Sequence, residues 1–170
     1  MPHPLVSADP ALDLLFSRDV PLTPDEIWAG WTQAEHLLHW FTPAPWQTVE
    51  CVIEPRAGGR FFSVMRSPEG ETFPAEGCVL AADPGRQLVW TNTLQAGYRP
   101  AQLGNGLDCN TFPFTVTLAL QACATGTHYR ALVQHRDAAG REQHAAMGFQ
   151  EGWGKALDQL VAYMLARREG

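Results

Sequence analysis

The chain has 170 residues, a hydrophobic fraction of 45% and a formal net charge of −6 at pH 7. This size favours a single domain with its own core. The acidic balance and the lack of a basic stripe exclude an electrostatic site for a nucleic-acid backbone. No apolar run approaches the roughly 20 residues of a membrane span. The N-terminus lacks the basic start and apolar core of a signal peptide, so we expect a cytoplasmic protein that binds neither nucleic acid nor membrane.

The chain divides into a short tail and one expected domain. Residues 1–11 are rich in proline and polar side chains and predict a flexible tail. Residues 12–168 carry periodic apolar patterns with no internal repeat, and we expect them to form the single domain.

One strand and two short helices are predicted at the start of this domain. Alternating apolar residues indicate a strand over residues 12–20. Thr23 and Glu26 have the spacing of a capping box, so a helix is expected to begin at Pro24. A second short helix is predicted over residues 34–40.

The apolar residues then change to the two-residue period of strands. Six further strands are expected, one at residues 49–54 and the others over 60–66, 73–82, 86–94, 112–122 and 127–136. Short turns join most of them, which indicates an antiparallel meander. The connection 96–111 is long and glycine-rich, as in loops that form lids or binding sites.

A last amphipathic segment, residues 141–168, is predicted as one helix of about 40 Å. Its apolar face carries Ala146, Phe149, Trp153, Ala156, Leu157, Leu160, Val161 and Met164, and its outer face carries His144, Glu151, Lys155, Asp158, Gln159 and Ala166. So wide an apolar face requires an extended partner, which the sheet provides. Gln150 falls near the centre of the apolar face, where it either bonds a loop carbonyl or faces a ligand cavity. Gly148, Gly152 and Gly154 indicate close approach by another segment or space beside the helix.

The predicted architecture is therefore α+β: a curved antiparallel sheet of about seven strands around a long C-terminal helix, with two short helices after the first strand. In this order, several motifs resemble the Aha1-type domain (activator of Hsp90 ATPase homologue) of the START/Bet v 1-like, or SRPBCC, superfamily. The motifs are FSR at 16–18, PDEIWAGW at 24–31, LHWF at 38–41, GG at 58–59, EG at 76–77, PGRQLVW at 84–90, MGFQEGW at 147–153 and LDQL at 157–160. The similarity covers about residues 12–165, and the long loop at 96–111 departs from it.

This resemblance implies a helix-grip fold with a cavity between the sheet and the long helix. The superfamily uses that cavity for lipids, polyketides and other apolar molecules. Its members include cyclases, hydrolases and binding proteins, so the fold does not decide the function. The family's chaperone-activating proteins carry an additional N-terminal domain, for which this chain has no room.

Apolar side chains with inward phase give the candidate ligand-binding residues. The candidates are six apolar residues and the polar Gln150: Phe61, Met65, Trp90, Phe114, Met147, Gln150 and Trp153. A concave surface of Trp, Phe and Met is typical of an apolar ligand site, although aromatic residues also fill cores. We therefore predict binding of an apolar or aromatic small molecule. The alternative is a protein-interaction module that binds another protein, such as a chaperone, through the sheet edge or the loop at 96–111. A homodimer is compatible with the sequence, because sheet edges and apolar surfaces often pair.

Two titratable residues are weak catalytic candidates. His135 lies at the end of the last predicted strand, where it is either a general base or a solvated or hydrogen-bonded side chain. Glu76 is a buried acid with a raised pKa, a charge at a strand edge, or the partner of Arg60 or Arg86 in an ion pair. An enzyme of the cyclase or hydrolase type is the least supported hypothesis, and no catalytic set is assigned.

The sequence predicts neither a metal nor a cofactor. The cysteines, at positions 51, 78, 109 and 123, form no CxxC pair and are expected to be mostly buried in a reducing compartment, with Cys109 in a loop. His36 and His39 have a spacing that can chelate a metal, but no carboxylate or cysteine nearby completes the set.

Overall fold

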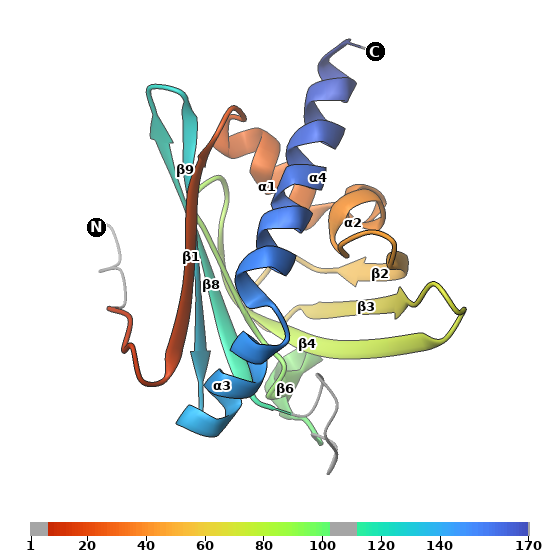
Figure 1. The fold of residues 1–170 in the computed structure, drawn as a ribbon, viewed down its shortest axis with the longest axis vertical. Helices are drawn as coiled ribbons and strands as arrows, with labels where there is room; N and C mark the ends of the chain where they lie inside the picture. The colour runs from red at the N-terminus through yellow and green to blue at the C-terminus, as the bar shows by residue number, and fades with distance from the viewer. Residues whose placement is uncertain (1–6, 103–111, 170) are drawn as a thin grey trace.

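A curved antiparallel sheet of seven strands dominates the computed structural model, which describes residues 7–102 and 112–169 (Figure 1). Its strands are β1 (Asp13–Val20), β2 (Gln47–Ile53), β3 (Arg60–Arg66), β4 (Thr72–Asp83), β5 (Gln87–Thr91), β8 (Phe114–Cys123) and β9 (Gly126–His135). They lie in the order β1-β9-β8-β5-β4-β3-β2. The strands from β2 to β9 thus form a meander, and its last strand, β9, pairs with β1. The predicted α+β helix-grip architecture is confirmed.

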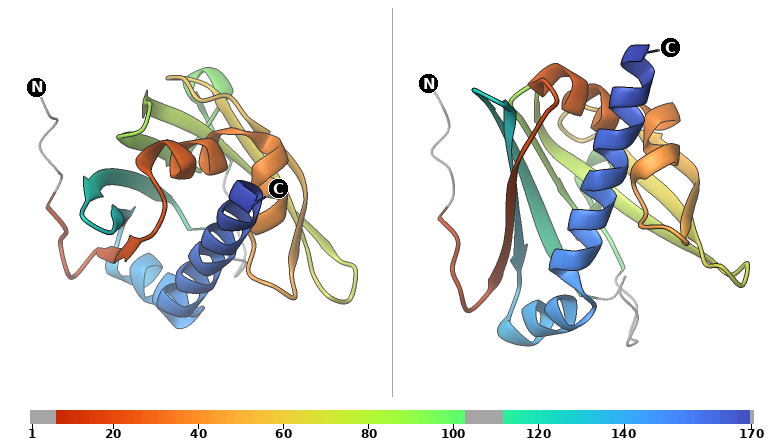
Figure 2. Two further views of the ribbon diagram at one scale, coloured as in Figure 1. Left: turned by 90° about the horizontal axis from the view of Figure 1, so that it is seen from above. Right: turned by 45° about the horizontal axis from the view of Figure 1, so that its top comes forward.

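The helices lie on the concave side of this sheet, and α4 passes inside its curve (Figure 2). The helices are α1 (Pro24–Thr32), α2 (Ala34–Trp40), α3 (Ala138–Ala146) and α4 (Phe149–Glu169). A small ladder of β6 (Leu94–Gln95) and β7 (Arg99–Pro100), joined by the 3-10 helix η1 (Ala96–Tyr98), follows β5. No helix within the described residues is long and apolar enough to cross a membrane.

The start of α1 has the predicted capping box. The Thr23 hydroxyl accepts a hydrogen bond from the backbone N–H of Glu26 at 3.1 Å, and the Glu26 carboxylate accepts one from the backbone N–H of Thr23 at 3.0 Å. Pro24 occupies the first helical position, where no N–H is required. These local signals fix where the chain leaves β1 and turns across the sheet.

The core fills the space between the concave face of the sheet and the helices. Buried side chains from α4 are Phe149, Ala156, Leu157, Leu160 and Met164. Each large apolar side chain contributes about 1.5–3 kcal/mol by leaving water. The predicted apolar face of the last helix is therefore correct from Phe149 onward, whereas Ala146 is exposed.

The single helix expected over residues 141–168 is wrong, because the chain breaks between α3 and α4. Gly148 has φ +84°, a left-handed conformation that other residues adopt only with strain. Its N–H donates to the carbonyl oxygen of Ala145 at 3.1 Å, which ends α3, and α4 starts at the next residue. The break changes the helical phase of every residue before it relative to α4.

Gly148, Gly152 and Gly154 have three different structural roles. Gly148 provides the break just described. A Cβ on Gly154 would lie 2.9 Å from the guanidinium of Arg18, so this glycine permits close approach of β1. A Cβ on Gly152 would meet nothing within 4 Å, so this glycine borders open space.

Strand β5 ends earlier than predicted, at Thr91. After Thr91 the Asn92 side chain, rather than the backbone of β5, bonds the neighbouring main chain. Its amide N–H donates to the carbonyl of Phe112 and its amide oxygen accepts from the N–H of Phe114, both at 2.9 Å. Much of the loop expected at 96–111, with Cys109, lies outside the described residues.

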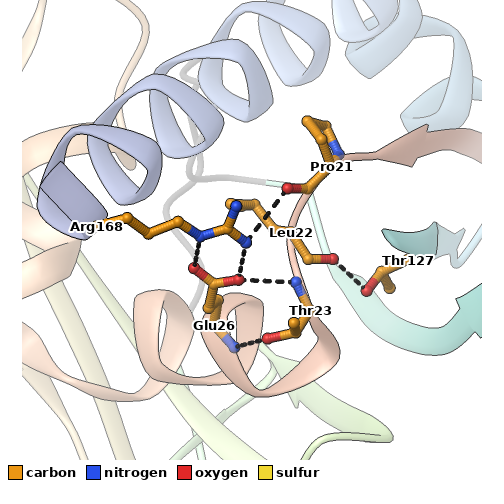
Figure 3. Close-up of polar contacts among 6 residues, drawn as sticks. All are labelled: Pro21, Leu22, Thr23, Glu26, Thr127 and Arg168. Atoms are coloured by element: carbon orange, nitrogen blue, oxygen red, sulfur yellow. Dashed lines mark hydrogen bonds and ion pairs between the residues drawn. The ribbon is translucent and has the colours of Figure 1, made fainter. Parts of the chain in front are cut away.

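Arg168 ties the end of α4 to the start of α1 (Figure 3). Its guanidinium donates to both carboxylate oxygens of Glu26, with Nε 2.7 Å from Oε2, and to the carbonyl oxygen of Pro21 at 3.4 Å. Beside it, the hydroxyl of Thr127 on β9 donates to the carbonyl of Leu22 at 2.6 Å. The hydrogen bonds from Arg168 lower the pKa of Glu26 to about 2.

We expect Glu26→Gln to lower the free energy of unfolding by roughly 0.5–1 kcal/mol, because glutamine keeps the capping bonds but loses the charge that faces Arg168. The small value reflects solvent screening, since 46% of the Arg168 side chain is exposed. Urea denaturation measures the change. Asp25→Asn is the control, because Asp25 lies in the same helical turn and has no ion-pair partner among the described residues. Equal losses in both variants would contradict a stabilising role for the Arg168 pair.

Candidate functional site

An aromatic cluster joins α1 to strand β9 of the sheet. Trp31 is 1% exposed, and its indole N–H donates to the hydroxyl of Tyr129 on β9 at 3.2 Å. The rings of Trp40, Phe41 and Trp153 lie 5.1, 5.7 and 6.5 Å from the Trp31 ring, centroid to centroid. Burial raises the pKa of Tyr129, so this phenol stays protonated and can hydrogen-bond in the core.

A cavity of about 290 Å³ lies between this cluster, the sheet and the start of α4. It is lined by Trp90, Phe114 and Tyr129 from the sheet, by Trp31, Trp40, Phe41 and Pro43 from the α1–α2 region, and by His144, Met147, Gly148, Phe149, Gly152, Trp153 and Ala156 from the C-terminal helices. Its surface is mostly apolar, and it opens to solvent. Gly152, at which a Cβ would meet no atom within 4 Å, is one of the lining residues.

Four of the seven ligand-binding candidates from the sequence line the cavity: Trp90, Phe114, Met147 and Trp153. Phe61 lies behind the lining, 3% exposed, with its ring 4.8 Å from that of Trp90. Met65, four residues farther along β3, is not among the lining residues.

Gln150 also lies outside the cavity lining. Its side chain is exposed, and its amide donates to the carbonyl oxygen of Leu15 at 3.0 Å. Strand β1 is an edge of the sheet, so carbonyl groups on its free side need partners from outside the ladder. Of the two expectations for Gln150, the bond to a main-chain carbonyl is the one observed, although the carbonyl belongs to a strand.

His135 and His144 form a hydrogen-bonded pair at the α3 end of the cavity. His135 ends β9 and is 7% exposed. Its Nδ1 lies 2.9 Å from the carbonyl oxygen of Leu12, and its Nε2 lies 3.0 Å from Nδ1 of His144. His144 lines the cavity, so a titratable group from the outer face of the predicted helix is part of the site.

Three phenylalanine rings surround His144. The centroids of Phe112, Phe114 and Phe149 lie 4.9, 5.8 and 5.2 Å from that of His144. Burial in this apolar setting, with a smaller effect of His135, lowers the pKa of His144 from 6.5 to about 4. Burial also lowers the pKa of His135. Both rings are therefore neutral at pH 7.

Trp90 contributes a buried polar atom to the cavity wall. Nε1 of Trp90 has no hydrogen-bond acceptor among the described residues. The Trp90 ring packs edge-to-face against Phe114, with centroids 5.5 Å apart. A buried N–H that finds no acceptor costs about 1–3 kcal/mol.

Glu76 lies away from the cavity. It pairs across the ladder with Phe62, whose neighbour Phe61 points into the core, so Glu76 lies on the opposite face of the sheet. Arg60 donates to both of its carboxylate oxygens, the shortest contact being 2.5 Å. This is the ion pair that the sequence offered as the alternative to a buried acid.

His36 and His39 both contact one tyrosine. Nδ1 of His36 lies 2.8 Å from the hydroxyl of Tyr163, and the ring of His39 stacks on the Tyr163 ring at 4.7 Å. Within the described ranges, no three His, Cys, Asp or Glu side chains come together as metal ligands.

A second hollow of about 410 Å³ lies between α2 and β2. It is larger but more polar, and its lining includes Thr42, Thr48 and Gln159. The Gln159 amide donates to the carbonyl oxygen of Thr42 at 2.9 Å, and the Thr42 and Thr48 hydroxyls are 2.5 Å apart. Because these polar groups bond one another, the apolar cavity is the better candidate site.

The sequence did not identify His144 as a site residue. The expectation of one helix with a single phase from residue 141 to residue 168 placed His144 on the outer face. The available signal was Gly148, since a glycine after a helical segment often ends it.

The comparisons with known proteins agree with this fold. A family model described as Activator of Hsp90 ATPase homolog 1-like protein matches residues 21–165. A protein from Nitrosomonas europaea is 36% identical, with 95% of this chain and 99% of that chain covered and a TM-score of 0.86. A Rhodobacter sphaeroides protein is 26% identical over 92% of this chain and 93% of its own, with a TM-score of 0.76. No match was found among curated proteins.

We expect acid to destabilise the fold through His144. The folded state lowers the pKa of this ring to about 4, so the unfolded chain binds more protons below pH 6.5 and stability falls as the pH drops toward 4. Between pH 7 and pH 4.5 this single group accounts for a loss of about 2 kcal/mol. Urea denaturation at both pH values should show a correspondingly smaller loss in His144→Leu.

The matched control is His128→Leu, because His128 lies on the same strand as His135 but its side chain is 43% exposed. Its pH dependence should stay closer to that of the wild type than the pH dependence of His144→Leu does. An unchanged pH dependence in His144→Leu would contradict the assigned burial.

Proposed function

The chain belongs to the Activator of Hsp90 ATPase homolog 1-like protein family, and from this membership and the open apolar cavity we propose that it binds a small apolar or aromatic molecule. The cavity is the observation that carries the proposal. Its walls include Trp31, Trp90 and Trp153, yet about 290 Å³ stays open between them. A fold selected for packing alone would fill such a space, because protein interiors are close-packed.

The volume indicates the size of the ligand. An apolar cavity of about 150 Å³ can hold one benzene molecule. At about 290 Å³, the cavity of this chain therefore suits a molecule of about two fused or linked rings. Large aromatic walls favour a flat ligand, because aromatic pairs stack or pack edge-to-face.

Gly152 supports the proposal independently. A glycine inside a helix costs about 1 kcal/mol relative to alanine. No atom would clash with a Cβ at this position, so packing does not require the glycine. Space for a ligand beside α4 is a reason to keep it.

A protein-interaction module has less support. The family's name points to a chaperone partner, but in the described part of the chain the exposed large apolar side chains do not gather on one element. They are Leu15, Leu38, Val49, Tyr98 and Met147, on β1, α2, β2, η1 and the α3–α4 turn. A homodimer built on the β1 edge would have to displace Gln150 from the Leu15 carbonyl.

A reducing compartment such as the cytoplasm fits the thiols of the described residues. Cys51, Cys78 and Cys123 are all free. Burial raises the pKa of Cys51 to about 11, so this thiol stays protonated and unreactive.

We expect naphthalene to quench the tryptophan fluorescence saturably, because Trp31, Trp90 and Trp153 line the cavity. Gly152→Leu should weaken this binding about tenfold or more, since its side chain would occupy the open space and displace apolar ligand contacts. Leucine is a good helix former, so the variant should stay folded.

Ala162→Leu, on the exposed side of α4, is the control and should bind as the wild type does. Circular dichroism checks that all three proteins are folded. A Gly152→Leu variant with unchanged affinity, or a folded wild type without saturable quenching, would refute binding in this cavity.

A further inference from the structure

The histidine pair has a fixed direction of hydrogen bonding. The Leu12 carbonyl oxygen can only accept, so Nδ1 of His135 carries the proton and donates to it. In a neutral ring, Nε2 of His135 is then an acceptor, and Nδ1 of His144 must be the donor across the 3.0 Å contact. The remaining nitrogen, Nε2 of His144, holds a lone pair.

This lone pair belongs to a ring of the cavity lining. Among the described residues, Nε2 of His144 has no hydrogen-bond partner, although the ring lines the cavity. Two other ring nitrogens of the wall, Nε1 of Trp31 and of Trp40, already donate, at 3.2 and 2.9 Å, to the Tyr129 hydroxyl and the Gly30 carbonyl. Nε1 of Trp90 carries a proton and can only donate. His144 therefore offers a hydrogen-bond acceptor in an otherwise apolar space.

The charged groups near the pair act on His135 rather than on His144. Asp13 on β1, Asp137 before α3 and Arg141 within α3 all influence the His135 ring, with opposing signs. His144 is surrounded instead by the rings of Phe112, Phe114 and Phe149. Nothing among these neighbours favours a charged His144.

We propose that Nε2 of His144 is the polar anchor of the ligand site and accepts a hydrogen bond from a hydroxyl group on an aromatic ligand, as in a phenol. The inference rests on the proposed binding function and specifies its ligand class. His135 is a positioning residue: it holds the His144 ring in the tautomer that presents a lone pair.

The chemistry of the anchor distinguishes ligands that donate from those that only accept. A hydroxyl can donate to a neutral imidazole nitrogen, whereas an ether oxygen would place two lone pairs against each other. A carboxylate would require a protonated ring, which burial disfavours. The site therefore selects a neutral hydroxyl over an ether or a carboxylate.

Isothermal titration calorimetry at pH 7 with 2-naphthol, 2-methoxynaphthalene and naphthalene tests the inference. We expect the wild type to bind 2-naphthol about fivefold more tightly than 2-methoxynaphthalene, the value of one net hydrogen bond. His144→Leu should lose this preference while retaining naphthalene, and the surface control His128→Leu should keep it. Equal affinity of the wild type for all three probes overturns the anchor but leaves apolar binding intact. Absence of binding for all three overturns the proposed function as well.

Nitrogen-15 NMR of the histidine rings tests the anchor without any substitution. At pH 7, Nδ1 of His144 should carry the proton and Nε2 should not, and addition of 2-naphthol should shift Nε2 while leaving the ring of His128 unchanged. Loss of the single His144 tautomer in His135→Leu would support the positioning role. A proton on Nε2, or a charged His144 ring in the wild type, would overturn the inference even if His144→Leu fails to fold.

Discussion

The left-handed backbone at Gly148 is the constraint from which the site follows. It ends α3 and lets α4 begin at Phe149, whose ring is buried in the core. Because the chain changes direction there, α3 lies across the end of β9, and His144 comes within 3.0 Å of His135. One continuous helix would have kept His144 on its outer face, and the cavity would have lacked its acceptor. A position that demands positive φ thus decides which side chain lines the cavity.

The cavity also depends on the contacts that hold α1 against the sheet and α4 against α1. The buried bond between Trp31 and Tyr129 fixes α1 against β9, and the rings of Trp40 and Phe41 pack on Trp31. At the other end, Arg168 fixes the last turn of α4 to Glu26. These contacts hold α1 against β9 and the end of α4 against α1. A rigid frame of this kind lowers the entropic cost of binding, because little has to be ordered when a ligand enters.

Much of the fold could be predicted from local signals. The capping box at Thr23 indicated the start of α1, and the two-residue period located the strands. Trp90, Phe114 and Trp153 of the cavity followed from strand parity and helix phase, whereas Met147 lies in the turn between α3 and α4. The failures have a common physical cause, since they depend on tertiary relations. Gln150 lies toward a free strand edge that no local pattern reveals, and Asn92 ends β5 by bonding residues about 20 positions away. His144 required knowledge of the helix break.

Intermolecular NOE measurements with 2-naphthol test most directly whether the apolar cavity is the ligand site. Contacts from the ligand protons to the Met147 methyl group and to the rings of Phe114 and Trp153 are the predicted result, because these groups line the cavity from both sides. Contacts confined to Leu38 and Trp46, in the polar hollow between α2 and β2, would contradict it and place binding on a different surface.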